Sequence, residues 1–123
     1  MTTNYKQNLG QWGENKAAHF LSAKGYKIIA RNVRTPHGEI DLIAQRNNLQ
    51  IFVEVKTRTS KKFGYPEEAI TLSKQNHMLE AAQHYLFEEY SEPPDWQIDV
   101  IAILGKLNST SPEIIHFENV RIN

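Results

Sequence analysis

Three carboxylates and a lysine lie within two apolar segments of the sequence, at positions where Val or Ile would stabilise a buried strand better. Glu39 and Asp41 belong to GEIDLIAQ, and Glu54 and Lys56 belong to LQIFVEVKT. Closely spaced carboxylates are ligands for a hard cation such as Mg²⁺ or Mn²⁺, which also takes oxygens from phosphate. A lysine beside them can orient or deprotonate a water, or stabilise charge on a phosphoryl group. The residue types predict phosphodiester hydrolysis if the fold brings them together.

The spacing of the two segments predicts a β-hairpin that does so. Residues 47–48 are both Asn, which tolerates positive φ and suits a tight turn. With this turn the numbers of paired residues add to 95, so that Asp41 faces Glu54 and Glu39 faces Lys56. Because side chains alternate along a strand, these four residues share one face. The other face carries the apolar residues Ile40, Leu42, Ile51, Val53 and Val55.

Two carboxylates directly opposite each other repel, because their Cβ atoms lie only about 5 Å apart. Shared protonation, neutralisation by Lys56 or a bound divalent cation would relieve the repulsion, and the Val55 carbonyl could add a backbone ligand to a cation. Glu39 is either an outer ligand or the residue that pairs with Lys56 and holds it in place. The alternative for the whole cluster is a solvated strand face on which Glu54 and Lys56 are ordinary outward charges.

The remaining pattern predicts the elements that position these residues in one domain over 1–123. Ala17, Ala18 and Leu21 share a helix face with Glu14, and Gly25 is placed to cap that helix in the left-handed conformation. Two glycines inside this helix lower its propensity, which predicts close packing at Gly10 and Gly13. The expected fold is α/β, a mixed β-sheet flanked by helices. Its helices cover 8–24 and 72–90, and its strands cover 26–34, 39–45, 49–57, 97–104 and 112–120.

Composition limits the class of protein. The 123 residues include no cysteine, and no segment approaches the roughly 20 apolar residues of a membrane-spanning helix. A cytoplasmic protein without a membrane partner is therefore expected. Residues 24–74 carry ten basic against five acidic side chains, whereas residues 75–123 carry two against eight. Such an excess can attract a polyanion, unless the fold scatters these charges.

The sequence also resembles a known family. The strings GEIDLIA and FVEVKTR, with GEN and RN before them and EAI after them, resemble the YraN-like family of small bacterial proteins. That family is identified as a member of the restriction-endonuclease-like, or PD-(D/E)xK, superfamily, and is similar to archaeal Holliday-junction resolvases. The resemblance implies a core of order α-β-β-β-α-β-β, with Asp41, Glu54 and Lys56 as the catalytic motif. It also implies Glu14 as a further acidic ligand, so that Glu14, Asp41, Glu54 and Val55 hold the metal.

The predicted function is that of a Mg²⁺- or Mn²⁺-dependent nuclease acting on branched or single-stranded DNA in preference to RNA, as a homodimer or a monomer. The alternatives are a nucleic-acid-binding module that does not cleave, and a protein scaffold. The segment RTSKKFGYP either follows a nucleic-acid backbone or anchors a loop, and the lysine that begins the second helix either contacts phosphate or is merely solvated. The predicted nucleic-acid-binding residues are Arg34, Arg58, Lys61, Lys62 and Lys74.

Overall fold

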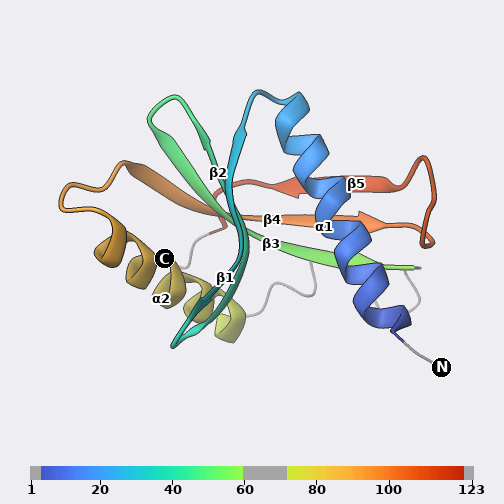
Figure 1. The fold of residues 1–123 in the computed structure, drawn as a ribbon, viewed down its shortest axis with the longest axis horizontal. Helices are drawn as coiled ribbons and strands as arrows, with labels where there is room; N and C mark the ends of the chain where they lie inside the picture. Colours follow the sequence, from blue (N-terminus) through green and yellow to red (C-terminus); the bar gives the residue numbers. More distant parts are fainter. Residues whose placement is uncertain (1–3, 60–71, 121–123) are drawn as a thin grey trace.

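The computed structural model describes residues 4–59 and 72–120, which form two helices and five strands (Figure 1). Their order along the chain is helix, three strands, helix and two strands, as the sequence predicts. Within these residues neither helix has the length and apolar character needed to cross a membrane. The elements are α1 (Tyr5–Ala23), β1 (Lys27–Thr35), β2 (Gly38–Arg46), β3 (Leu49–Arg58), α2 (Leu72–Glu89), β4 (Asp95–Leu104) and β5 (Glu113–Phe117).

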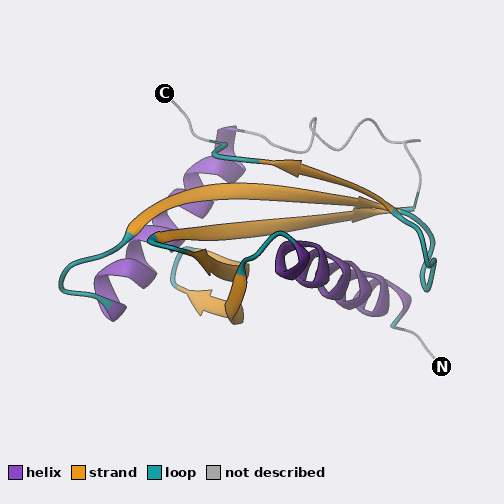
Figure 2. Ribbon diagram, turned by 90° about the horizontal axis from the view of Figure 1, so that it is seen from above, coloured by secondary structure: helices purple, strands orange, loops and turns teal. Residues whose placement is uncertain are grey.

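The five strands form one mixed sheet in the order β1-β2-β3-β4-β5. Neighbouring strands are antiparallel except β3 and β4, which run parallel and are connected through α2. Figure 2 shows α1 and α2 on opposite faces of this sheet. The expected α/β architecture, a mixed sheet flanked by helices, is therefore confirmed.

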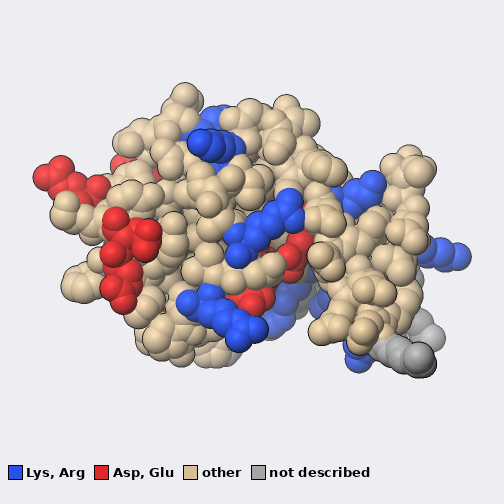
Figure 3. Space-filling model, viewed as in Figure 1, with Lys and Arg blue, Asp and Glu red and all other residues tan. Residues whose placement is uncertain are grey.

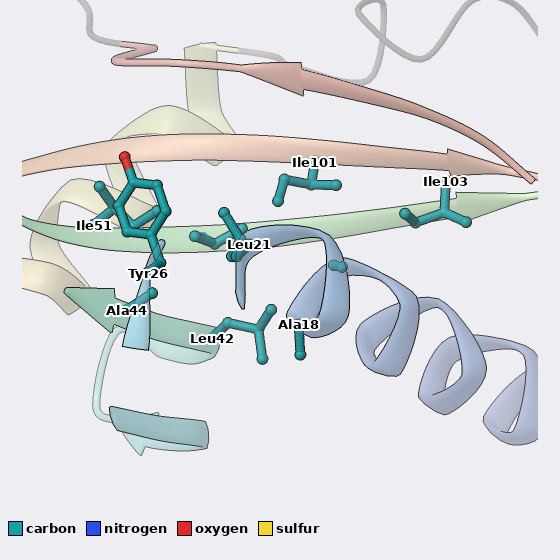
Figure 4. Close-up of a cluster of buried hydrophobic side chains, with 10 residues drawn as sticks. Ala18, Leu21, Tyr26, Leu42, Ala44, Ile51, Ile101 and Ile103 are labelled. Carbon is teal, nitrogen blue, oxygen red and sulfur yellow. The ribbon is translucent and has the colours of Figure 1, made fainter. Parts of the chain in front are cut away.

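An apolar cluster lies on each face of the sheet. On the α1 side, Ala18 and Leu21 pack on residues of β2, β3 and β4 (Figure 4). On the α2 side, Phe52 packs edge-to-face on Tyr85 and on Trp96, with ring centroids 5.8 and 6.0 Å apart. Five residues of α2 at helical spacing belong to this second cluster or pack against it. They are Met78, Ala81, Ala82, Tyr85 and Leu86.

The first helix ends as its sequence predicts. Gly25 has a φ of +93°, in the left-handed region that favours glycine. Its N–H donates to the Ser22 carbonyl at 3.0 Å, and the Tyr26 N–H donates to the Leu21 carbonyl at 3.0 Å. These two bonds satisfy carbonyls that a helix end leaves without partners, and they form a Schellman motif. The chain then turns directly into β1.

The two glycines inside α1 have different environments. A Cβ atom at Gly13 would overlap the Thr57 hydroxyl and lie 3.0 Å from the Thr57 Cβ, so α1 approaches β3 closely here. At Gly10, nothing lies within 4 Å of the position of a Cβ atom. Close packing is thus confirmed at Gly13 and wrong at Gly10. Because Gly13 directly precedes Glu14, this contact sets the height of the Glu14 carboxylate above the sheet.

Gly13→Ala is expected to destabilise the protein by about 1–3 kcal/mol, since overpacking forces backbone or side-chain shifts. Gly10→Ala is the matched control and is expected to stabilise the helix by about 0.5–1 kcal/mol. Urea unfolding of both variants measures the difference. Thr57→Ala combined with Gly13→Ala should recover part of the lost stability, because it removes the overlapping hydroxyl but keeps the Cβ atom 3.0 Å away. Equal effects of the two glycine substitutions would contradict the close contact of α1 with β3.

Candidate metal and nucleic-acid site

The ladder between β2 and β3 has the predicted register but ends before the charged residues. Asn47 has a φ of 54°, as expected for the predicted turn. Paired residues follow the predicted register from this turn to the last pair, Leu42 with Val53. The sequence also predicts that Asp41 pairs with Glu54 and that Glu39 pairs with Lys56. Both pairs lie beyond the end of the ladder, so this part of the prediction is wrong.

Where the ladder ends, the Asp41 side chain replaces a backbone carbonyl as the hydrogen-bond acceptor. In the register of the ladder, Val55 would exchange hydrogen bonds with Ile40. Instead, the Val55 N–H donates to Asp41 Oδ2 at 2.8 Å. Ile40 packs with Ile43 in the α2-side cluster, whereas Leu42 packs on the α1 side, so the predicted face of Ile40 is also wrong. The strand bends away from β3 at Asp41, and the carboxylate lies at the opening between the two strands.

Helix α1 brings a second carboxylate to this opening, because Glu14 lines the same cavity as Asp41. Burial raises the pKa of the Glu14 carboxyl above its ordinary value. A hydrogen bond with the Asn32 side chain lowers this pKa, and the negative charge of Glu39 raises it. Asn32 has a φ of 51° and lies in β1 between the partners of Leu42 and Ile40, opposite Asp41.

The electrostatics of Asp41 reflect crowding among carboxylates. Burial raises the pKa of its carboxyl from 3.8 to about 6. The hydrogen bond from the Val55 N–H lowers this pKa, while the negative charges of Glu14, Glu54 and Glu39 raise it. The backbone N–H of Val55 thus stabilises the negative charge of Asp41, and the three neighbouring carboxylates oppose it. Such a group gains stability from a proton or a bound cation.

A compact ion pair occupies the neighbouring position on β3. Lys56 Nζ lies 2.8 Å from Glu54 Oε2, and the two side chains are only 15% and 23% exposed. Lys74, in the first turn of α2, lies next to Lys56. A hydrogen bond with Lys56 lowers the pKa of the Lys74 ammonium, and burial lowers it further. Two adjacent lysines, Lys56 and Lys74, therefore lie beside Glu54.

These residues line three neighbouring hollows in the surface. A cavity of about 430 Å³ has Asp41 and Lys56 in its wall, together with Glu14, Val55, Lys6 and Arg58. It shares Gly10 and Glu14 with a hollow of about 660 Å³ beside β1. That hollow shares Glu39 with a smaller one of about 240 Å³, which also contains Glu54 and Lys74. We refer to these three neighbouring hollows at the open end of the β2–β3 hairpin as the groove; Asp41 and Lys56 line one of them, and Glu54 lines another.

The remaining predicted residues have varied positions. Glu39 Oε2 lies 3.9 Å from Arg34 Nε, and Lys56 contacts Glu54, so the predicted pairing of Glu39 with Lys56 is replaced by other partners. The Arg34 side chain is 91% exposed. Arg58 lies at the rim of the cavity and donates to the Thr57 carbonyl at 2.9 Å. The predicted residues Lys61 and Lys62 lie outside the described residues.

Sequence reasoning missed three residues at this site. Asn32 could have been predicted from the hairpin of β1 and β2. With a turn at residues 36–37, the numbers of paired residues add to 73, which places Asn32 opposite Asp41. Lys6 lies in the first turn of the same helix as Glu14 but outside the predicted helix range. Gly10 lies one turn before Glu14 and leaves the space above it open. No local pattern distinguishes this use of glycine from close packing.

A separate polar cluster contains Asp99, His116 and Glu118, whose potential ligand atoms lie within 4.8 Å of one another. His116 Nε2 lies 2.7 Å from Asp99 Oδ2, and its Nδ1 lies 2.9 Å from Lys24 Nζ. The Asn119 N–H also donates to Asp99 Oδ1 at 2.9 Å. An ammonium group on the far side of the imidazole opposes a cation, so we interpret this cluster as a hydrogen-bonded connection between α1, β4 and β5.

The fold and the groove define a class: a small α/β protein with an acidic site where the first hairpin of its sheet opens. The chain belongs to the family described as Uncharacterised protein family UPF0102, whose model matches residues 13–103. This range includes Glu14, Asp41, Glu54 and Lys56, and the match confirms the resemblance to the YraN-like family.

Curated relatives match most of the chain. A UPF0102 protein of Symbiobacterium thermophilum is 50% identical over 97 residues, which cover 79% of this chain and 82% of the relative. A UPF0102 protein of Syntrophotalea carbinolica is 44% identical over 115 residues, covering 94% and 92%. Another from Caldicellulosiruptor saccharolyticus is 45% identical over 98 residues, covering 80% and 83%. These relatives share the family name with this chain, and their names state no activity.

Proposed function

We propose that this protein is a divalent-metal-dependent nuclease that hydrolyses phosphodiester bonds in DNA and has a restriction-endonuclease-like core. One observation carries the proposal: where the β2–β3 ladder ends, Asp41 and Glu14 share a cavity with Lys56, and Lys56 is paired with Glu54. A folded protein gains nothing in stability from half-buried carboxylates that repel one another. Their retention at a hollow is instead typical of a functional site.

The donor set fits Mg²⁺ or Mn²⁺. Glu14, Asp41 and Glu54 offer carboxylate oxygens, and Oε2 of Glu54 is paired with Lys56. A residue in a ladder directs its N–H and carbonyl to the same neighbouring strand. Since the Val55 N–H points to Asp41, its carbonyl oxygen faces the same opening. A bound ion would supply charge to the scissile phosphate and acidify a water.

Lys56 is the residue that we assign to the chemistry of the phosphate. Its ammonium group is largely buried and is held by Glu54, so it occupies one position beside the carboxylates. From there it can orient or deprotonate the attacking water, or stabilise the negative charge that develops on the phosphoryl oxygens. Lys74 adds a second positive charge next to it.

The groove also has the cations needed to hold a nucleic-acid backbone. Lys6 and Arg58 line the cavity beside Asp41, Lys74 lines the smaller hollow with Glu54, and the exposed Arg34 side chain lies 3.9 Å from Glu39. Phosphate contacts of this kind provide affinity that falls steeply with salt. An open groove admits a single strand or a branch point without the need to widen a duplex groove. Sedimentation velocity with and without DNA tests whether the protein acts as a homodimer.

A cleavage assay tests this function. The purified protein is incubated with labelled junction, flap, duplex and single-stranded DNA, and with RNA of the same sequence, in Mg²⁺, Mn²⁺ or EDTA. Products are expected only with metal, and DNA is expected to be cleaved in preference to RNA. Salt-dependent binding with no metal-dependent product on any substrate would instead favour a non-cleaving binding module. Neither binding nor cleavage at low salt would favour a protein scaffold.

A further inference from the structure

A second hollow of about 490 Å³ lies at the other end of the molecule, between the C-terminal end of α2 and the start of β4. Its floor includes Leu86, which is 5% exposed, together with Tyr90, Pro93 and Trp96. Phe87 lines it and is 87% exposed, more than the other exposed large apolar side chains of the described residues. We call this hollow, with its five apolar or aromatic residues, the aromatic groove.

The floor of the aromatic groove is held in place by the core. The Trp96 ring packs edge-to-face on Phe52, with centroids 6.0 Å apart. The Tyr90 hydroxyl accepts a hydrogen bond of 3.0 Å from Gln50 Nε2, and Gln50 is completely buried. Rigid aromatic residues at the centre of a hollow are typical of the anchor points at which protein partners bind.

Acidic residues lie beside the aromatic groove on α2 and on the connection to β4. Residues 75–105 contain no Lys or Arg. Glu88, Glu89, Glu92 and Asp95 are all exposed around the end of α2 and the connection to β4. Figure 3 shows acidic side chains gathered over this end of the molecule, while basic side chains lie over the middle and the opposite end. The aromatic groove is therefore an apolar surface inside an acidic border.

This border excludes several occupants. A nucleic acid and an anionic lipid surface are both repelled by it. A symmetric dimer centred on the groove would place the same acidic border of each copy against the other, because a two-fold interface brings identical patches together. Like charges opposed in an interface are unfavourable. A basic protein segment has no such conflict.

We propose that the aromatic groove binds a protein partner through a segment that inserts an apolar side chain between lysine or arginine residues. The apolar side chain covers Phe87 and Trp96, and the flanking cations pair with Glu88 and Glu92. Because the groove lies away from Asp41 and Lys56, the partner and a nucleic acid can bind at the same time. This inference does not depend on cleavage by the other site.

A designed peptide tests the groove directly. The probe is a fluorescein-labelled amphipathic helix with leucines on one face and lysines on the other; the control peptides replace every lysine by glutamate or every leucine by serine. Fluorescence anisotropy is expected to show binding of the lysine–leucine peptide that weakens with salt, and no binding of either control. In NMR spectra, the indole N–H signal of Trp96 is expected to shift while that of Trp12 stays fixed.

Phe87→Ser is expected to weaken binding of the peptide about tenfold, and Glu88→Lys combined with Glu92→Lys by a similar factor. All three residues are exposed, so these variants should fold. Tyr5→Ser, at another strongly exposed aromatic residue, is the matched control and should not change binding. No binding, equal binding of the glutamate peptide, or equal loss in Tyr5→Ser would overturn the proposal. A dimer in sedimentation that Phe87→Ser abolishes would overturn it in favour of a second copy.

Discussion

Lys56→Gln is expected to slow metal-dependent cleavage by about 10²- to 10⁴-fold, the range typical of a lost proton-transfer or charge-stabilising group. Glutamine retains a donor for Glu54 Oε2, which now lies 2.8 Å from the ammonium group, but it removes the charge. Single-turnover rates at saturating DNA measure the chemical step. Binding of DNA should change little, because other cations form the border of the groove.

Lys6→Gln is the matched control for this prediction. Lys6 is exposed at the rim of the same cavity, so it can contact a phosphate but not the reacting group. Its substitution should weaken binding of all DNA sequences and reduce the salt slope by about one, with the saturated rate unchanged. If Lys56→Gln acted in the same way as Lys6→Gln, Lys56 would be a binding residue rather than a catalytic one.

Asp41→Asn is expected to stabilise the metal-free protein by up to about 3 kcal/mol at pH 8, and to abolish metal binding. The wild-type protein holds the Asp41 carboxylate in a half-buried position among Glu14, Glu54 and Glu39, which raises its pKa from 3.8 to about 6. Asparagine has nearly the same shape, and its oxygen can still accept the hydrogen bond from the Val55 N–H. Urea unfolding in EDTA measures the gain.

The pH dependence of this gain follows from the direction of the shift. Between about pH 4 and 6 the folded protein binds a proton at Asp41 more tightly than the unfolded chain does. Lowering the pH through this window therefore stabilises the wild-type protein, and raising it removes that stability. The advantage of Asp41→Asn should be full above about pH 6 and should vanish below about pH 4.

Asp95→Asn is the control for the stability prediction. Asp95 is exposed, and a surface substitution of this kind is expected to change stability by no more than about 0.5 kcal/mol at either pH. A loss of stability in Asp41→Asn, or a gain that does not depend on pH, would mean that Asp41 is an ordinary structural carboxylate.

Local sequence signals predict much of this fold. The turn at residues 47–48 fixes the hairpin register, and Gly25 fixes the end of α1, since both depend on backbone conformations that few residues tolerate. The apolar runs of β4 and of the second helix predict which faces are buried. These features need no knowledge of distant residues.

The bend at Asp41 could not be predicted in the same way. The bend depends on the positive φ of Asn32 in the neighbouring strand and on the Asp41 side chain, which accepts a hydrogen bond from the Val55 N–H. It also depends on an apolar space for Ile40 on the α2 side of the sheet. Simple alternation predicts a continuous ladder and so pairs Lys56 with Glu39. The adjacency of Lys74 and Lys56 also arises only when α2 crosses the sheet. The sequence therefore predicts the residue types of the site, whereas the contacts between these residues depend on tertiary structure.

Calorimetric titration of Mn²⁺ at pH 7.5 into the wild-type protein and into Asp41→Asn, each mixed with a non-cleavable phosphorothioate oligonucleotide, tests whether Asp41 holds a metal ion. We expect saturable binding of Mn²⁺ by the wild-type protein and none at this site in the variant. No binding by the wild-type protein, or the same binding by Asp41→Asn, would contradict this expectation.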